Sequence, residues 1–234
     1  MPKHEYGREG AYLQNEVLKR LALWVGLPMV LCVFMLGLTL AGQMPWLCLL
    51  PLVLLSPAIP GLMKRWEHHA DKAVDPYIKG FGGERDVADA LRALGNDCYL
   101  IHDLDFGHGN VDHVAVTPAG IFTIETKAYA GSVWTKGDKL YVNRIDHEKD
   151  LKQAYGEACT VRDYLGRVSG GRPHTVTPLM VFSQAKISSY GKCRGVHVMG
   201  IGRLAEFMAS ERQVLDGPQR SAIAAALGTR VTAL

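Results

Sequence analysis

Residues 21–42 form an uncharged, strongly apolar run, and this run limits what the N-terminal part of the chain can fold into. A helix needs roughly 20 apolar residues to cross the hydrocarbon core of a bilayer. The run from Leu21 to Gly42 is slightly longer than that. The sequence therefore predicts a transmembrane helix here.

A second uncharged run follows the short turn at 42–45 and reaches Leu62. Its prolines interrupt a regular helix and predict a shorter, kinked span; they are Pro51, Pro57 and Pro60. Together, residues 21–63 are predicted to form a transmembrane helical hairpin.

Basic residues flank both runs, with Lys19 and Arg20 before the first and Lys64 and Arg65 after the second. Cytoplasmic flanks of membrane spans are enriched in Lys and Arg. We therefore expect a multi-pass protein of the inner (cytoplasmic) membrane, with the soluble domain in the cytoplasm. The five cysteines form no C-x-x-C pair, which agrees with a reducing compartment.

Two alternatives to the hairpin stay open. A secretory signal peptide has an apolar region of about 7–15 residues, whereas this run is longer and follows Glu5, Glu9 and Glu16. A buried helical hairpin in a soluble domain would be expected to show a polar face, and neither run offers one.

The predicted domain organisation has four parts. They are an N-terminal cytosolic segment (1–20), the transmembrane hairpin (21–63), a juxtamembrane linker helix (64–79) and the main domain (80–234).

Strand-like and helix-like patterns alternate in the main domain, after a predicted helix breaker at 80–83. Helices are predicted at 84–94, 149–165, 204–208 and 219–227, and strands at 98–104, 111–117, 121–127, 176–182 and 196–201. A further strand at 133–142 contains a Gly137-Asp138 turn. This order predicts an α/β (α+β) domain with a central mixed sheet flanked by helices.

The strands at 111–117 and 121–127 are separated by a short turn and should form a hairpin. The turn at 117–120 places Val114 opposite Thr123 and Asp112 opposite Glu125. Opposite residues in such a pair have Cβ atoms about 4.5–5.5 Å apart on one face. Two carboxylates are therefore expected to meet at the end of the hairpin.

Lys127 lies two residues beyond Glu125 and points to the same face. Adjacent carboxylates repel unless a cation lies between them, and such oxygen ligands suit Mg²⁺ or Mn²⁺. The sequence predicts a metal site with Lys127 beside it. The alternative is a surface hairpin in which Lys127 forms a salt bridge with a carboxylate, and geometry alone leaves both open.

Three motifs resemble the nuclease-related domain (NERD), a family similar to the restriction-endonuclease-like PD-(D/E)xK superfamily. They are Gly83-Glu84 at a helix start, Gly109-Asn110-Val111-Asp112-His113, and Gly120-Ile121-Phe122-Thr123-Ile124-Glu125-Thr126-Lys127. The resemblance covers roughly residues 79–190. It implies a restriction-endonuclease-like fold and a Mg²⁺-dependent (or Mn²⁺-dependent) phosphodiesterase.

The resemblance also implies roles for individual residues. Asp112 and Glu125 would be metal ligands with the backbone carbonyl of Thr126, and Lys127 would be the catalytic lysine.

Two more residues take implied roles. Glu84 resembles an acidic residue that completes the metal site, although it could be only a favourable charge in a first helical turn. Gln153 resembles a helix glutamine near the lysine and the phosphate. Related exonucleases have a Q-x-x-x-Y pattern, and here Glu157 stands in place of the tyrosine.

Histidines and aromatic residues near these motifs have less specific roles. His113 should point away from Asp112 and pack or hydrogen-bond, whereas His102 and His108 near the strand ends could approach a substrate. Tyr129 and Trp134 could stack on bases, although aromatic core residues are commoner.

The sequence thus predicts a membrane-anchored, metal-dependent nuclease that hydrolyses phosphodiester bonds in DNA. The net charge of +3 is mild for a nucleic-acid-binding protein, so an alternative is an inactive nuclease-fold module that binds nucleic acid or partner proteins at the membrane. The expected partners are DNA and the lipid bilayer. RNA and homo-oligomerisation are left open.

Overall fold

The computed structural model describes residues 4–8, 11–42, 77–107, 109–187 and 190–231. The chain divides into two compact units, Leu13–Ile78 and a domain made of Met1–Tyr12 with Lys79–Leu234. The predicted second membrane span and residues 64–76 of the predicted linker helix lie outside the described residues. The four predicted domain boundaries stay predictions.

In the smaller unit, three helical segments follow one another along the chain: α1 (Ala11–Leu21), the π-helical η1 (Ala22–Gly26) and α2 (Leu27–Leu40). The α2 segment has no charged residue, and Met29, Val33 and Phe34 expose their apolar side chains. Within the ranges that the structure describes, no helix is both long and apolar enough to span a membrane.

A contact in the same unit joins the two ends of the uncharged region. Arg20 Nη2 donates a hydrogen bond of 2.7 Å to the hydroxyl of Tyr77, and its guanidinium lies 4.4 Å from the centre of the Tyr77 ring. The two residues that flank the uncharged region therefore lie in contact with each other.

A seven-stranded mixed sheet forms the centre of the domain, in the order β1-β2-β3-β4-β8-β11-β10. The strands are β1 (His4–Tyr6), β2 (Tyr99–Asp105), β3 (Asn110–Thr117), β4 (Gly120–Lys127), β8 (Val176–Phe182), β10 (Gly191–Cys193) and β11 (Val196–Gly200). The middle strand β4 is antiparallel to β3 and parallel to β8. The predicted mixed sheet is confirmed.

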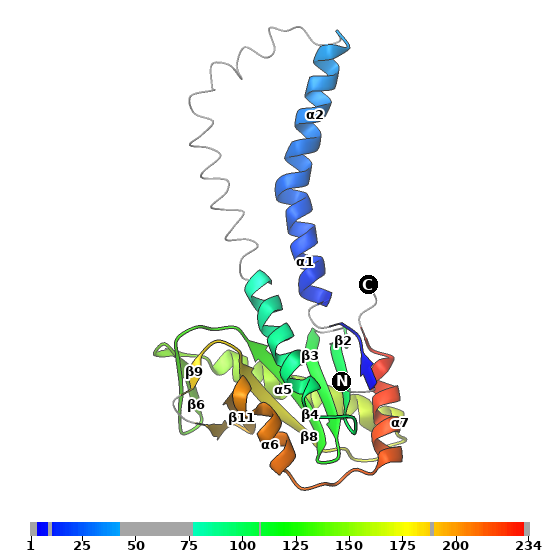
Figure 1. Ribbon diagram of the computed structural model, residues 1–234, viewed down its shortest axis with the longest axis vertical. Helices are drawn as coiled ribbons and strands as arrows, with labels where there is room; N and C mark the ends of the chain where they lie inside the picture. Colours follow the sequence, from blue (N-terminus) through cyan, green and yellow to red (C-terminus); the bar gives the residue numbers. More distant parts are fainter. Residues whose placement is uncertain (1–3, 9–10, 43–76, 108, 188–189, 232–234) are drawn as a thin grey trace. The chain divides into compact units, whose positions relative to one another are not determined.

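Helices cover both faces of this sheet, and the layers can be followed in Figure 1. On one face, α5 (Glu148–Val168) and α7 (Gly217–Gly228) pack their apolar side chains on β2, β3 and β4. On the other face, the helix at 77–92 and α6 (Leu204–Ser210), which follows the short η4 (Ile201–Arg203), pack on β3, β4, β8 and β11. The predicted α/β architecture with flanking helices is confirmed.

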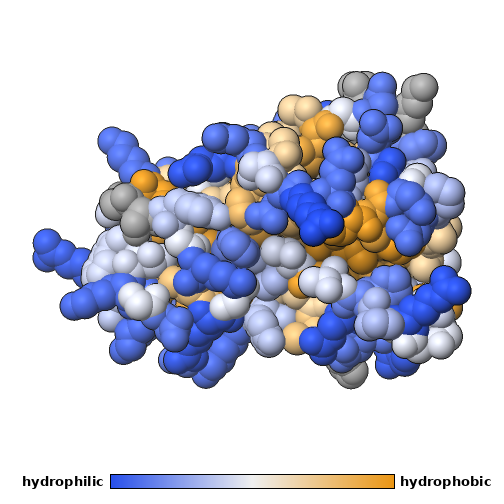
Figure 2. All heavy atoms as spheres, turned by 90° about the horizontal axis from the view of Figure 1, so that it is seen from below, coloured by the Kyte–Doolittle hydropathy of each residue, from blue (hydrophilic) through white to orange (hydrophobic). Residues whose placement is uncertain are grey.

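A small second sheet lies beside the main one, in the order β7-β6-β5-β9. Its strands are β5 (Ser132–Lys136), β6 (Lys139–Val142), β7 (Ile145–Asp146) and β9 (Lys186–Ile187). The predicted extended segment at 133–142 and the turn at Gly137-Asp138 inside it are confirmed as the β5–β6 hairpin. Seen from below, the surface is mostly hydrophilic, with hydrophobic residues showing between the hydrophilic ones (Figure 2).

The N-terminal strand β1 belongs to the domain, although it precedes the uncharged run in the sequence. It pairs in parallel with β2, with Glu5 opposite Leu100. The Glu5 carboxylate contacts the Arg92 guanidinium and lies 3.0 Å from Nε2 of His102. A strand in residues 1–20 was not predicted from the sequence.

The predicted helix breaker at 80–83 is wrong, because the helix at 77–92 runs through it. A close contact of Gly83 explains why a glycine stands at this position of the helix. A Cβ atom on Gly83 would lie 3.0 Å from Cβ of Ala128 and 2.9 Å from Oγ of Ser183. Only a glycine lets the helix come this close to the end of β4, and the gain in packing outweighs the poor helix propensity of glycine.

Replacing Gly83 by Ala should lower the free energy of unfolding by about 1–3 kcal/mol, because the added methyl group overpacks against Ala128. Gly82→Ala is the matched control, since a Cβ there meets no atom within 4 Å, and it should be neutral or stabilising. Thermal and denaturant unfolding of both variants would measure this. Equal effects of the two substitutions would contradict the close contact.

Candidate active site

The hairpin of β3 and β4 brings the two predicted carboxylates together. Val114 pairs with Thr123 and His113 with Ile124, which confirms the predicted register. The paired residues end at His113 and Ile124, and Asp112 and Glu125 are the next residues of the two strands, close enough for the charge of Glu125 to act on Asp112. Both lie on the side of the sheet that α5 covers, because side chains alternate between the faces of a strand.

Lys127, at the end of β4, is held among groups from two elements. Its Nζ atom lies 2.7 Å from Oε1 of Glu125, 3.2 Å from Oε1 of Gln153 and 3.8 Å from Oδ1 of Asp150. Burial alone would lower the pKa of Lys127, but the charge and hydrogen bond of Glu125 raise it above its usual value. The lysine is therefore a fixed positive charge in the site.

Asp112 accepts a hydrogen bond of 2.8 Å from the backbone N–H of Thr126, which fixes its carboxylate beside the end of β4. Burial, and then the charges of Glu125 and Glu84, raise the pKa of Asp112 well above its usual range. Surroundings that destabilise the ionised form of Asp112 in this way would be stabilised by a bound cation.

Glu84 lies in the helix at 77–92, and its side chain is buried. The close packing of Gly83 on the end of β4 brings the next residue, Glu84, near enough for its charge to act on Asp112. Of the predicted site residues, the structure thus gathers Glu84, Asp112, Glu125, Thr126, Lys127 and Gln153 at one end of the sheet.

Glu157, one turn after Gln153 on α5, is a site member that sequence reasoning missed. Its Oε1 accepts a hydrogen bond of 3.0 Å from Nε2 of Gln153, and its carboxyl group also contacts Glu125. Burial and the charge of Glu125 raise the pKa of Glu157 to about 10. The signal that could have found it is the spacing of four residues from Gln153, which puts both on one helix face.

The described residues include no group of three or more His, Cys, Asp or Glu side chains arranged to hold a metal ion. The space beside Glu125 is taken by Lys127 instead. Nevertheless, Glu125 is only 3% exposed, and among the described residues the buried Oε2 atoms of Glu125 and Glu157 have no assigned hydrogen-bond donor, although the two carboxyl groups contact each other. An orphaned carboxylate oxygen among other carboxylates fits a hard cation such as Mg²⁺ or Mn²⁺.

The histidine pair lies on the opposite face of the sheet from Asp112. Nδ1 of His113 is 2.8 Å from Nδ1 of His102, and both rings are buried. The prediction for His113 is confirmed. The prediction that His102 could approach a substrate is wrong, because its ring is enclosed between His113 and Glu5. His108 lies outside the described residues.

The two aromatic candidates have structural contacts. The Tyr129 hydroxyl donates a hydrogen bond of 3.1 Å to Asp150, beside Lys127. Trp134 stacks on Tyr141 across the β5–β6 hairpin, with ring centres 4.3 Å apart.

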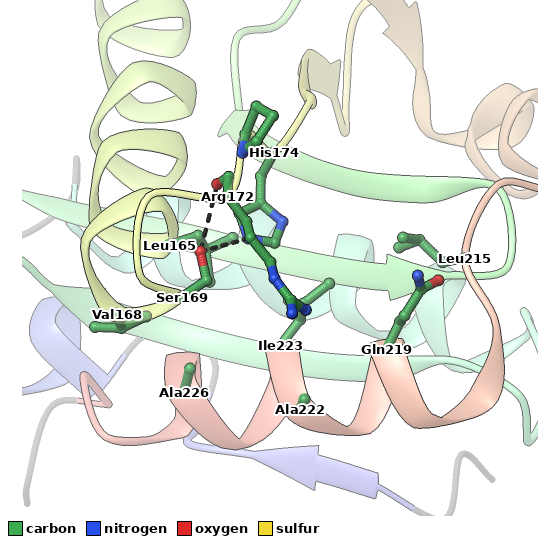
Figure 3. Close-up of a pocket in the computed structure, with 11 residues that line it drawn as sticks. Leu165, Val168, Ser169, Arg172, His174, Leu215, Gln219, Ala222, Ile223 and Ala226 are labelled. Carbon is green, nitrogen blue, oxygen red and sulfur yellow. Dashed lines mark hydrogen bonds between the residues drawn. The ribbon is translucent and has the colours of Figure 1, made fainter.

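A cavity of about 340 Å³ between the C-terminal part of α5 and α7 contains none of these site residues. In Figure 3, Leu165, Ile223 and Ala226 form apolar walls of this cavity. The Ser169 hydroxyl there donates to the carbonyl of Arg172 and contacts the His174 ring. It is a separate feature of the domain.

The raised pKa of Glu157 predicts how stability depends on pH without metal. Between its ordinary value of 4.5 and about 10, the folded state keeps a proton that the unfolded state has lost. The free energy of unfolding should therefore fall with rising pH, by at most about 1.4 kcal/mol per pH unit. Glu157→Gln should remove this loss and so gain stability over the wild type as pH rises.

Urea unfolding at pH 5, 7 and 9 in the presence of a chelator would measure that difference. Glu148→Gln is the control, because Glu148 lies on the same helix but is ion-paired near the surface with Lys152. A difference between Glu157→Gln and the wild type that stays constant with pH would contradict the raised pKa.

Residues 79–183 match the family model of the nuclease-related domain. A search of curated proteins found no match, and neither did a search of solved structures. The matched segment begins in the helix that carries Glu84 and ends just after β8, so it includes every predicted site residue. This segment of the chain is therefore similar to the nuclease-related domain.

Proposed function

We propose that this protein is a membrane-anchored, metal-dependent nuclease that hydrolyses phosphodiester bonds in DNA. The observation that carries the proposal is the convergence of buried carboxylates around Lys127 at the end of β4. Burying carboxylates beside one another lowers the stability of a fold. A protein that keeps such a cluster therefore uses it for a function. Metal-assisted hydrolysis of a phosphodiester uses such a combination of anionic ligands and a positive charge beside the phosphate.

In this proposal Asp112 and Glu125 hold Mg²⁺ or Mn²⁺, with the carbonyl of Thr126 and the carboxylate of Glu84 completing the set. The metal would supply a water of lowered pKa and a positive charge for the phosphate. Lys127 would stabilise charge on the phosphate or orient the attacking water, and Gln153 would keep Lys127 in place through the contact of 3.2 Å.

The membrane anchor is the second part of the proposal. The uncharged run from Leu21 to Gly42 and the apolar side chains exposed on α2 support it. Two contacts support a hairpin whose ends lie on one side. Arg20 meets Tyr77, and β1, which precedes the run, pairs with β2, which follows it.

One observation favours the alternative of an inactive binding module. The Nζ atom of Lys127 lies 2.7 Å from Oε1 of Glu125, so the lysine itself neutralises the charge of this carboxylate. If that salt bridge is the resting form of a working site, a divalent cation must displace the lysine from Glu125. If it is permanent, the domain binds nucleic acid without cutting it.

Replacing carboxylates and lysine separately should distinguish these cases. Asp112→Asn and Glu125→Gln should lose metal binding and DNA cleavage together, because each removes a charged ligand. Lys127→Met should keep metal affinity or increase it, because a competing positive charge is gone. Its cleavage rate should fall by roughly 10²–10⁴-fold, as expected for a positioned catalytic group.

Calorimetric titration with Mn²⁺ and cleavage of linear and circular DNA would be measured on the same detergent-solubilised full chain. The full chain is needed because a fragment starting after the uncharged region would lack β1. Lys139→Met, an exposed lysine on β6, is the matched control. Wild-type protein that binds DNA but no Mn²⁺ at millimolar concentration would establish the binding module instead.

The anchor predicts the side on which both ends lie. Tags fused at the N- and C-termini should both resist protease added to intact cells, and both should be digested in inverted membrane vesicles. A chain whose two tags differ in either preparation cannot have the hairpin topology.

A further inference from the structure

A second cavity, of about 440 Å³, opens beside the candidate active site. One wall comes from Phe106, Asn110 and Val111, around the connection of β2 and β3. The other wall is a face of α5, on which Lys152, Gly156 and Thr160 recur at helical spacing.

Gln153 and Glu157 join this cavity to the active site, because both line it and both contact site residues. Gln153 accepts a hydrogen bond from Lys127, and Glu157 lies against Glu125. A molecule in the cavity would therefore be next to the groups proposed to act on a phosphodiester.

The walls combine the features that bind a nucleotide. The Phe106 ring offers an aromatic surface and is held by an edge contact with Tyr164, with ring centres 5.5 Å apart. Asn110, whose amide donates a hydrogen bond to Asp103, and Thr160, whose hydroxyl donates to the Gly156 carbonyl, supply polar atoms to the wall. The exposed Lys152, which pairs with Glu148 at 3.0 Å, supplies a positive charge that a phosphate would compete for. Bases bind proteins by stacking on such rings, with cations along the backbone.

The volume of the cavity limits the size of the ligand that it can bind. Pockets for small ligands measure about 300–1,000 Å³, and this one lies near the lower end of that range. It has room for one nucleotide with its base unpaired.

We propose that this cavity is the subsite for one unpaired nucleotide next to the scissile phosphate, so that the site acts on single-stranded ends or on bases displaced from a duplex. The inference rests on the proposed nuclease function and adds its substrate class.

Gly156 gives a direct test, because a Cβ atom there would meet no other atom within 4 Å. A leucine at this position can extend into the cavity without straining α5. Gly156→Ala and Gly166→Ala are matched controls. Both make the same change on the same helix, and Gly166 lies outside the cavity, with its nearest neighbour 3.9 Å from an added Cβ.

The probe is deoxyadenosine monophosphate, with its affinity for the full chain measured by calorimetry beside the affinity for Mn²⁺. Gly156→Leu should weaken nucleotide binding by roughly tenfold or more, and both alanine controls should bind like the wild type. Mn²⁺ affinity should change in none of them. Phe106→Leu should also weaken nucleotide binding, which keeps the test valid if Gly156→Leu does not fold.

The results separate the two proposals. Nucleotide binding that is absent in the wild type, or equal in Gly156→Leu and Gly156→Ala, overturns the subsite even if the protein binds Mn²⁺ and cleaves DNA. Nucleotide binding that Gly156→Leu abolishes, in a wild type without Mn²⁺ binding or cleavage, supports the subsite while the nuclease proposal fails.

Discussion

Negative charge buried at the end of β4 is the constraint on which the rest of the domain depends. Carboxylates from β3, β4, α5 and the helix at 77–92 meet there, and Lys127 is the cation that the described contacts place among them. Leaving a buried charge unpaired costs several kcal/mol. The lysine therefore fixes the positions of its neighbours. The α5 helix must present Asp150 and Gln153 to it, and β4 must end where its side chain can reach both.

The two layers of helices serve this site in different ways. The α5 helix supplies polar side chains from its first turns while its later turns pack Val161 and Leu165 into the core, so one helix both anchors the sheet and lines the site. The helix at 77–92 instead contributes through proximity. Gly83 has no side chain, which lets the backbone approach β4 and brings Glu84 close to Asp112.

Local patterns in the sequence predicted the hairpin well, because a short turn fixes the register of Asp112 against Glu125. The residues missed depend on distant packing. Glu157 joins the site only because α5 turns that face toward the sheet, which helical spacing alone does not determine. The three residues of β1 have no alternating apolar pattern and gain their order from β2. The glycines at 80–83 suggested a helix end, but tertiary packing overrode their propensity.

The pairing of β1 with β2 makes everything between Gly7 and Cys98 one closed loop whose two ends are fastened to the same sheet. Closing a loop costs an entropy that grows only slowly with its length, so the part of this loop that precedes the helix at 77–92 can be lengthened or shortened at little cost to the domain. The length of the loop matters more during synthesis. The first strand of the sheet leaves the ribosome long before its partner, and its edge stays unpaired until the whole loop has been made.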